Sequence, residues 1–309
     1  MIMFKNLDLK YLNQIHLLIA AHQQSDSTKS IRKIYSKDFL YWYLKQIKEE
    51  YRIGMIYKKK LIGFATAIVI RMIINQEQML VPHIGLLCIQ SKVLHLKQNL
   101  INELKDRLKE FPTIITNIIN EESHTSSWSE YIIPINVPKL KIMNLIPNLT
   151  PCISLPHNPL HLMIESDISS LAEKLNHSLQ DLTIKVDFDT DFVKEFFLPK
   201  KNIVYSFVVR NGSEVTDFVS IYKSHLHCLE KNRIISVGNL SFYFCNSMPL
   251  TYLLAYLLDK LILYKIDLLA FTNQNQNDSI NLTKYPSSIQ SYYMNETLIC
   301  PDKSALFTF

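Results

Sequence analysis

The chain has 309 residues, of which 48% are hydrophobic and 20% charged, so it can bury a large core and form two domains or one duplicated domain. Its formal net charge of +5 is small and no basic stripe interleaved with aromatic residues stands out, which argues against nucleic acid as a partner. Charged residues or proline interrupt the longest apolar stretches before the ~20 residues that a membrane span needs, and the first ten residues lack the pattern of a signal peptide.

The cysteines indicate the compartment. There are five of them and none forms a CxxC motif, which fits thiols kept reduced as small core residues, so we expect a cytoplasmic protein. His225 and His227 would share one face of a strand, but the sequence pairs no third ligand with them. No G-x-S-x-G motif occurs either, so we predict neither a metal site nor a hydrolase triad.

The first half of the chain opens on a predicted helix with Asp8 as its N-cap. Its apolar residues recur at helical spacing, at Leu9, Leu12, Ile15 and Ile19. The elements that follow are a helix at 37–47, a strand at 52–57, a turn of three lysines, strands at 61–70 and 81–89, a helix at 98–109 and a strand at 113–117.

The second half predicts the same elements in the same order. A helix capped by Ser166 or Asp167 comes first, with apolar residues again at helical spacing. Asn211-Gly212 between two apolar runs predicts a hairpin turn. The complete series is a helix from 165, a helix at 190–198, strands at 203–209, 215–222 and 240–246, a helix at 250–263 and a strand at 268–273.

The two series are a repeat of helix–helix–hairpin–strand–helix–strand. Both their helix starts and their closing Thr-Asn pairs, at Thr116 and Thr272, lie 156 residues apart. We therefore expect an α/β (α+β) fold of two duplicated, pseudo-twofold units with a mixed, largely antiparallel sheet flanked by helices. A proline-rich crossover places the boundary near 160, between domains 1–160 and 161–309.

This order of elements resembles that of acetyl-CoA-dependent (GNAT-like) N-acyltransferase units. In such units a helix N-terminus binds the pyrophosphate, because its free N–H groups and the helix dipole favour anions. The corresponding place here is the segment from Cys88 into the helix at 98–109, where Lys92, His95 and Lys97 are the only cations. Three basic residues in a stretch of ten are a weak signal by themselves.

Several segments then resemble one family, the glycylpeptide N-tetradecanoyltransferases (N-myristoyltransferases), in order along nearly the whole chain. Leu7-Asp8-Leu9 resembles their opening L-D-L, and KKLIGFATAI resembles R-K-L-V-G-F-I-S-A-I. IYSKDFLYWYL is similar to D-Y-S-P-E-F-L-x-W-A-L, and IGLLCIQ to I-N-F-L-C-V-H. FVVRNGSEVTDFVSIY is similar to F-V-V-x-x-x-G-E-V-T-D-F-x-S-F-Y, and the final KSALFTF to K-V-G-L-V-L-Q.

The resemblance implies an acyltransferase that needs no cofactor. It binds myristoyl-CoA as co-substrate in 1–160 and a peptide with an N-terminal glycine in 161–309. The backbone amides matching Leu86 and Leu87 polarise the thioester carbonyl, and Thr116 lies near the attacking amine. The base is the chain's own C-terminal carboxylate, on Phe309, whose burial at the end of a predicted strand would raise its pKa. The implied binding residues are Cys88, Ile89, Lys92, His95 and Lys97 for acyl-CoA, and Asp26, Tyr35, Ser224 and Tyr243 for the peptide.

The sequence also departs from the family pattern. The basic R-S-K-R run is replaced by a shorter loop, VLHLKQ, and other acidic and His positions are missing, namely in 25–28, at Ile132 and in 285–287. One alternative is therefore a degenerate relative that binds lipid or peptide without turnover, and another is a transferase with a different acyl donor. Ordinary readings stay open for single residues, since Leu86 and Leu87 suit a core strand and Ser224 a solvated loop. We expect a monomer.

Overall fold

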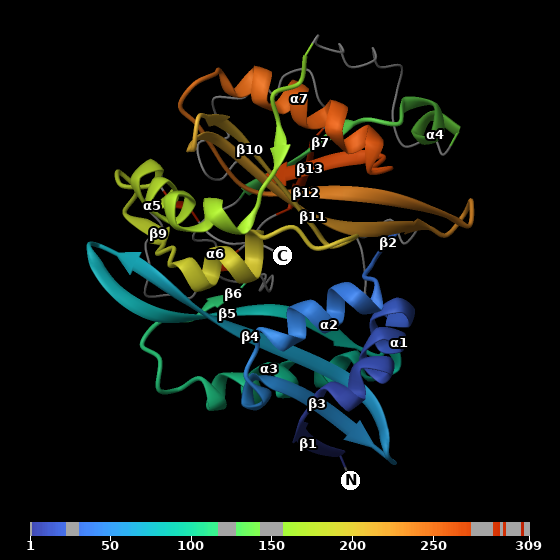
Figure 1. Ribbon diagram of the computed structural model, residues 1–309. Helices are drawn as coiled ribbons and strands as arrows, with labels where there is room; N and C mark the ends of the chain where they lie inside the picture. The colour runs from blue at the N-terminus through green and yellow to red at the C-terminus, as the bar shows by residue number, and fades with distance from the viewer. Residues whose placement is uncertain are drawn as a thin grey trace. The chain divides into compact units, whose positions relative to one another are not determined.

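The computed structural model describes residues 2–22, 31–116, 128–142, 157–272, 287–290, 293–294 and 304–305 (Figure 1). These residues form two compact units. Unit 1 comprises the described residues of 2–72, 77–116 and 293–294, and unit 2 comprises 73–76, 128–142, 157–272, 287–290 and 304–305. In the described part of the chain, no helix is both long enough and apolar enough to cross a membrane.

Unit 1 is built on a mixed sheet with the strand order β1-β3-β4-β5-β6-β15. Neighbouring strands are antiparallel in the pairs β1–β3, β3–β4 and β6–β15, whereas β5 and β6 are parallel. The elements are β1 (Ile2–Asn6), α1 (Leu12–His22), β2 (Ile31–Ile34), α2 (Lys37–Lys45), β3 (Arg52–Tyr57), β4 (Lys60–Ile74), β5 (Glu77–Ile89), α3 (Lys97–Arg107), β6 (Ile115–Thr116) and β15 (Tyr293–Met294).

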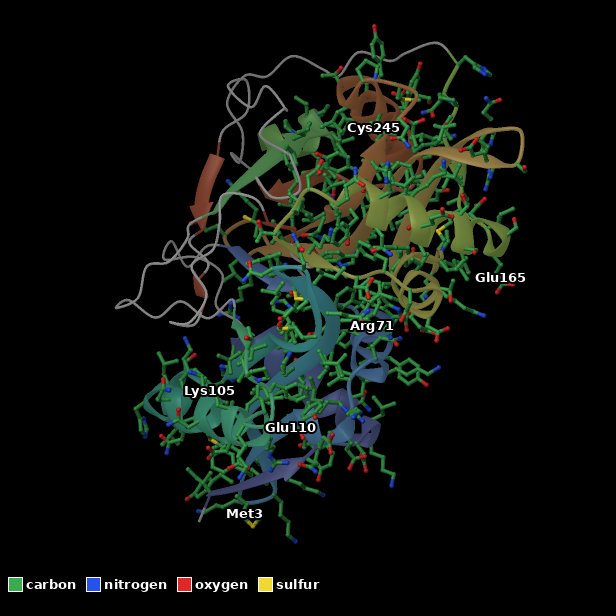
Figure 2. All side chains as sticks on the ribbon, turned by 90° about the vertical axis from the view of Figure 1, so that its left-hand side faces the viewer. Met3, Arg71, Lys105, Glu110, Glu165 and Cys245 are labelled. Atoms are coloured by element: carbon green, nitrogen blue, oxygen red, sulfur yellow. The ribbon has the colours of Figure 1, made fainter. Side chains whose placement is uncertain are left out.

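Local sequence explains where the helices of unit 1 begin. Asp8 accepts a hydrogen bond from the N–H of Lys10 and caps a short 3-10 turn that leads into α1. Ser36 caps α2 by accepting from the N–H of Phe39 at 3.0 Å. Glu110, which is labelled in Figure 2, accepts a hydrogen bond from Tyr51 Oη at 3.1 Å and so ties the end of α3 to the start of β3.

Unit 2 has a second mixed sheet, in the order β14-β7-β13-β12-β11-β10-β8. Here β12 and β13 are parallel, and β10, β11 and β12 form an antiparallel meander. The elements are β7 (Trp128–Pro134), α4 (Val137–Ile142), β8 (His161–Leu162), α5 (Ile168–Ser178), β9 (Ile184–Val186), α6 (Thr190–Phe197), β10 (Val204–Asn211), β11 (Glu214–Cys228), β12 (Arg233–Cys245), α7 (Leu250–Leu263), β13 (Leu268–Thr272), β14 (Ser287–Gln290) and β16 (Ser304–Ala305).

The predicted repeat is confirmed. Unit 1 runs α1-α2-β3-β4-β5-α3-β6 and unit 2 runs α5-α6-β10-β11-β12-α7-β13. In both units the strands before and after the last helix are parallel neighbours. The hairpin strands are longer than predicted, because β4 and β5 continue to a turn at Asn75-Gln76 in which both residues have positive φ. That turn is of the type that favours two-residue hairpins.

The sequence prediction missed β7 and α4. Both precede residue 160, yet β7 pairs with β13 and β14 inside unit 2. The long crossover between the two repeats therefore contributes an internal strand to the second sheet. The assignment of 1–160 to acyl-CoA and 161–309 to peptide stays a prediction.

Candidate functional site

The strand pair β5–β6 brings together three of the predicted site residues in unit 1. His83 pairs with Ile115 and Ile84 pairs with Thr116, where β6 ends. Leu86 and Leu87 follow two and three residues later on β5. Leu86 and Leu87 thus lie toward the carboxyl end of β5, the parallel neighbour of the strand that contains Thr116. Ligands of open α/β sheets commonly bind outside such strand ends.

The N–H of Leu86 has a side-chain partner. It donates to Thr66 Oγ1, on β4, at 3.1 Å, and both residues are buried. Alternate residues of β5 differ in exposure, since Gly85 and Leu87 are half-buried whereas Leu86 and Cys88 are buried. Because alternate side chains of a strand point to opposite faces, Gly85 and Leu87 lie on the accessible face.

Cys88 and Ile89, predicted to contact acyl-CoA, have side chains that are 4% and 6% exposed. The Sγ of Cys88 donates to the carbonyl of Leu18 at 3.6 Å. Burial raises the pKa of the Cys88 thiol to about 12, so the thiol stays protonated and is a poor nucleophile near neutral pH. Any contact of these two residues with a ligand has to come chiefly through the backbone.

The predicted phosphate-binding segment is a 3-10 turn, Ser91–Leu96, that leads into α3. Lys92 and His95 are exposed, and Lys97, half-buried, is the first residue of α3. No side chain caps this helix and its first turn holds no acidic residue. The N–H of Lys97 donates to the carbonyl of Leu94, so α3 continues directly from the turn that carries Lys92 and His95. This combination favours an anion.

The residues predicted for the peptide are divided between the units. In unit 1, Tyr35 is buried and stacks on Phe39 with ring centroids 4.9 Å apart. In unit 2, Ser224 lies on β11 and is 1% exposed, and its Oγ accepts from Asn239 Nδ2 at 2.9 Å. The reading of Ser224 as a solvated loop hydroxyl was therefore wrong. Tyr243, on β12, is half-buried against the core. Asp26 and Phe309 lie outside the described residues.

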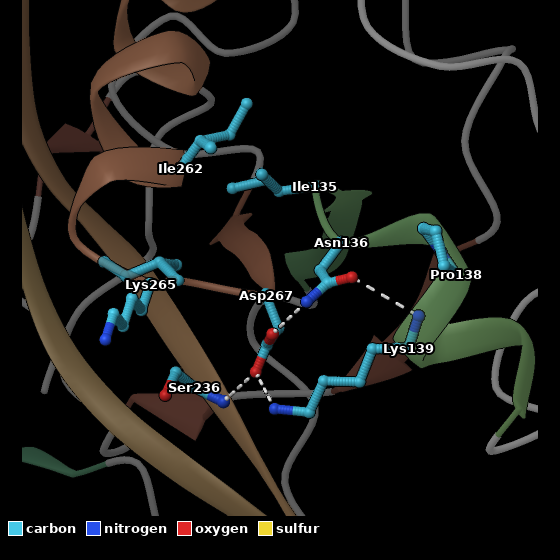
Figure 3. A pocket seen from close by; sticks show the side chains of 9 residues that line it. Ile135, Asn136, Pro138, Lys139, Ser236, Ile262, Lys265 and Asp267 are labelled. Carbon is cyan, nitrogen blue, oxygen red and sulfur yellow. Dashed lines mark hydrogen bonds and ion pairs between the residues drawn. The ribbon is translucent and has the colours of Figure 1, made fainter.

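An open pocket of about 570 Å³ in unit 2 was not predicted (Figure 3). At its floor the Asp267 carboxylate accepts from Asn136 Nδ2 at 2.9 Å, from Lys139 Nζ at 2.5 Å and from the N–H of Ser236 at 2.8 Å. These donors join α4 and the end of β7 to β12 and β13. A single acidic residue directly before the apolar run of β13 was the only hint of this network in the sequence.

The described residues contain no group of three or more His, Cys, Asp or Glu side chains that could hold a metal ion. His227, on β11, instead contacts Asn232 Oδ1 at 3.1 Å.

The chain matches known proteins over both units. Residues 2–118 match the model of the myristoyl-CoA:protein N-myristoyltransferase N-terminal domain, and residues 149–285 match that of the C-terminal domain. A protein of Acanthamoeba polyphaga mimivirus named "Putative glycylpeptide N-tetradecanoyltransferase" is 41% identical over 96% of this chain and 87% of its own length. The glycylpeptide N-tetradecanoyltransferase of Kluyveromyces lactis is 29% identical over 70% of this chain, a match that spans 53% of that protein.

Solved structures agree on the fold. The crystal structure of Saccharomyces cerevisiae N-myristoyltransferase with bound myristoyl-CoA superposes with a TM-score of 0.80, covering 94% of this chain and 82% of the yeast chain at 18% identity. A GCN5-related N-acetyltransferase from Anabaena variabilis superposes with a TM-score of 0.54, covering 97% of this chain and 74% of that protein at 10% identity. The expected GNAT-like architecture is thereby confirmed.

Proposed function

We propose that this chain, which belongs to the myristoyl-CoA:protein N-myristoyltransferase family, transfers a myristoyl group from myristoyl-CoA to the N-terminal glycine of peptides or proteins. The observation that carries the proposal is that Leu86 and Leu87 lie on β5, the parallel neighbour of the Thr116 strand, and that β5 leads into the turn with Lys92 and His95 and then into α3, which begins at Lys97. That arrangement offers backbone donors for a carbonyl oxygen next to a site for phosphate.

In the proposed reaction the glycine amine attacks the thioester carbonyl, a C–N bond forms, the C–S bond breaks and CoA leaves as the thiol. The backbone amides of Leu86 and Leu87 stabilise the oxyanion, and losing such a donor typically costs ~3–4 kcal/mol. The C-terminal carboxylate of Phe309 removes the proton from the amine, and Thr116 lies beside that amine. Direct attack is favoured over transfer through Cys88, because its thiol, with a pKa of about 12, is not available as thiolate.

Lys92, His95 and Lys97 are proposed to hold the CoA phosphates, with Cys88 and Ile89 contributing backbone contacts. Their exposure and their place at the start of α3 support this role. The peptide-binding roles of Asp26, Tyr35, Ser224 and Tyr243 stay predictions from the family resemblance, and the structure buries Tyr35 and Ser224. We further propose that the protein acts as a cytoplasmic monomer, in keeping with Cys88 and Cys228 being free thiols in the structure.

The test is to measure CoA release from myristoyl-CoA with a Gly-Asn-x-x-x-Ser peptide. We expect turnover, and a large loss of kcat when one residue is added at the C-terminus. Replacing Lys92, His95 and Lys97 together by Ala should raise KM for myristoyl-CoA and weaken its salt dependence. Replacing the exposed Lys58, Lys59 and Lys60 of the β3–β4 turn is the matched control, which removes three cations elsewhere in the same unit. Equal effects of the two triple variants would contradict the phosphate site.

One observation favours a second candidate, a lipid- or peptide-binding relative without turnover. The Leu86 N–H already has an acceptor in Thr66, so its availability to an oxyanion depends on that contact. Calorimetry showing tight binding of myristoyl-CoA with no CoA release would support this candidate. The altered loop at 93–98 leaves open which acyl-CoA is the donor. Competition between CoA thioesters of different chain length identifies it.

A further inference from the structure

The hydroxyl of Tyr43 fills the space into which a side chain at residue 85 would project. A Cβ added to Gly85 would lie 2.0 Å from Tyr43 Oη and 3.2 Å from its Cζ. Real atoms do not approach this closely, so residue 85 has to be glycine while Tyr43 is present. The hydroxyl therefore reaches from α2 to the backbone of β5, on the face where Gly85 and Leu87 are half-buried.

The hydroxyl joins a buried polar chain that ends on Leu86. The same Cβ position lies 3.6 Å from Thr66 Oγ1, which accepts the Leu86 N–H at 3.1 Å. Tyr43 and Thr66 are both fully buried. Burial raises the pKa of Tyr43 to about 12, while hydrogen bonding to Thr66 and to the backbone of Leu86 acts in the opposite direction. Tyr43 is thus a neutral phenol whose buried hydroxyl lies close to Thr66 and to the backbone of β5.

We propose that Tyr43 and Thr66 are positioning residues that fix the Gly85–Leu87 segment by holding the Leu86 N–H toward β4, so that the N–H of Leu87, on the opposite side of the strand, is the donor to the thioester oxygen. The inference rests on the proposed acyl transfer. β4 is a hydrogen-bonded neighbour of β5 in the sheet, and the Thr66 side chain on β4 adds a contact to the Leu86 N–H. Oxyanion donors act only within a few tenths of an ångström of their optimum, and a small misplacement lowers the rate steeply.

The steric half of the proposal is tested without any substrate. Gly85→Ala should lower the melting temperature strongly, and Tyr43→Phe should restore most of that loss in the double variant, because the 2.0 Å contact is removed and 3.2 Å remains. Gly54→Ala is the matched control, since its Cβ would meet Leu7 at 2.6 Å and not Tyr43. The fall in melting temperature caused by Gly54→Ala should be the same whether position 43 holds Tyr or Phe. Additive effects for Gly85→Ala would overturn the proposed contact.

The functional half compares Thr66→Val with Thr66→Ser and Tyr43→Phe. We expect Thr66→Val and Tyr43→Phe to lower kcat about tenfold with KM for both substrates unchanged, and Thr66→Ser to restore kcat. Hydrogen exchange of the Leu86 amide, measured by NMR, should accelerate in Thr66→Val and stay slow in Thr66→Ser. Unchanged kcat and unchanged exchange in Thr66→Val and Tyr43→Phe would overturn the positioning role.

The outcomes separate the two proposals. A wild-type protein without turnover refutes the proposed function, yet the exchange of the Leu86 amide still decides whether Tyr43 and Thr66 hold this segment. The double variant Tyr43→Ala with Gly85→Asn tests the same contact with a larger side chain at position 85 and the Tyr43 ring removed. It should be more stable than Gly85→Asn alone, whereas equal or lower stability would show that the two positions do not depend on each other.

Discussion

Two ion pairs in unit 2 have the same N–O distance and very different surroundings. Lys139 Nζ lies 2.5 Å from Asp267 Oδ2, and Lys174 Nζ lies 2.5 Å from Glu214 Oε1. The Asp267 side chain is 6% exposed, whereas that of Glu214 is 63% exposed. We predict that Asp267→Asn destabilises the protein strongly and that Glu214→Gln leaves its stability unchanged.

The size of the Asp267 effect follows from its three donors. Neutralising the carboxylate weakens two hydrogen bonds and the contact with Lys139, which is itself only about one-third exposed. Removing one partner of a buried pair costs about 3–5 kcal/mol, because the other charge stays desolvated. In the second pair Lys174 is 22% exposed but the Glu214 carboxylate is largely in water, so the screened attraction offsets little more than side-chain entropy.

The assay is urea unfolding followed by tryptophan fluorescence and circular dichroism. A lowered urea midpoint with an unchanged m-value would report a stability change alone. Adding Lys139→Met to Asp267→Asn should recover part of the loss, since no uncompensated charge then remains. Equal midpoints for Asp267→Asn and Glu214→Gln would refute the reasoning, and so would a double variant no more stable than Asp267→Asn.

Three further predictions concern titration, thiols and a loop anchor. Burial and nearby Lys223 lower the pKa of His225. Below about pH 6.5 the unfolded chain therefore binds more protons than the folded protein. The free energy of unfolding should accordingly fall from pH 7 to pH 5. His225→Gln should flatten that fall, and an unaltered slope would contradict it. Cys88 and Cys228, both buried, should resist alkylation at pH 8 until urea unfolds the protein, as mass spectrometry of the labelled peptides can show. Asp217 is fully buried and accepts hydrogen bonds from the N–H groups of Asn246 and Ser247 at 3.0 Å, which anchors the loop after β12. Asp217→Asn should lower the free energy of unfolding, measured in urea, by about 2–3 kcal/mol. A loss below about 1 kcal/mol would contradict this role of Asp217.

Sequence patterns predicted the duplicated order of elements because each element carries its own local signal. The helix at 250–263 was predicted with the bounds of α7, since its apolar spacing is continuous and Pro249 precedes it. Strand ends were predicted less well. β11 extends to Cys228, beyond the predicted end at 222. Its last six residues, 223–228, are mostly polar or histidine, and such a sequence also suits a loop.

The polar network behind the site was not predictable from the same signals. Tyr43 and Gly85 are distant in the sequence, and their fit depends on how α2 crosses β5. A tyrosine in the apolar run of α2 suits a core position equally well, and here it is one, fully buried. β7 was missed although it has a counterpart: β7 pairs antiparallel with β13, as β15 pairs with β6, and both pairings join segments distant in the sequence.

Backbone chemistry changes which residues the proposed activity constrains. If the oxyanion donor is the amide of Leu87, the side chain of that residue can vary as long as the strand keeps its position. The constraint passes to the groups that hold the strand, which are Thr66 at 3.1 Å from the Leu86 nitrogen and Tyr43 in the space above Gly85. A chain of this family can then lose several substrate-facing side chains and keep its donors, provided that substitutions at positions 43, 66 and 85 remain matched.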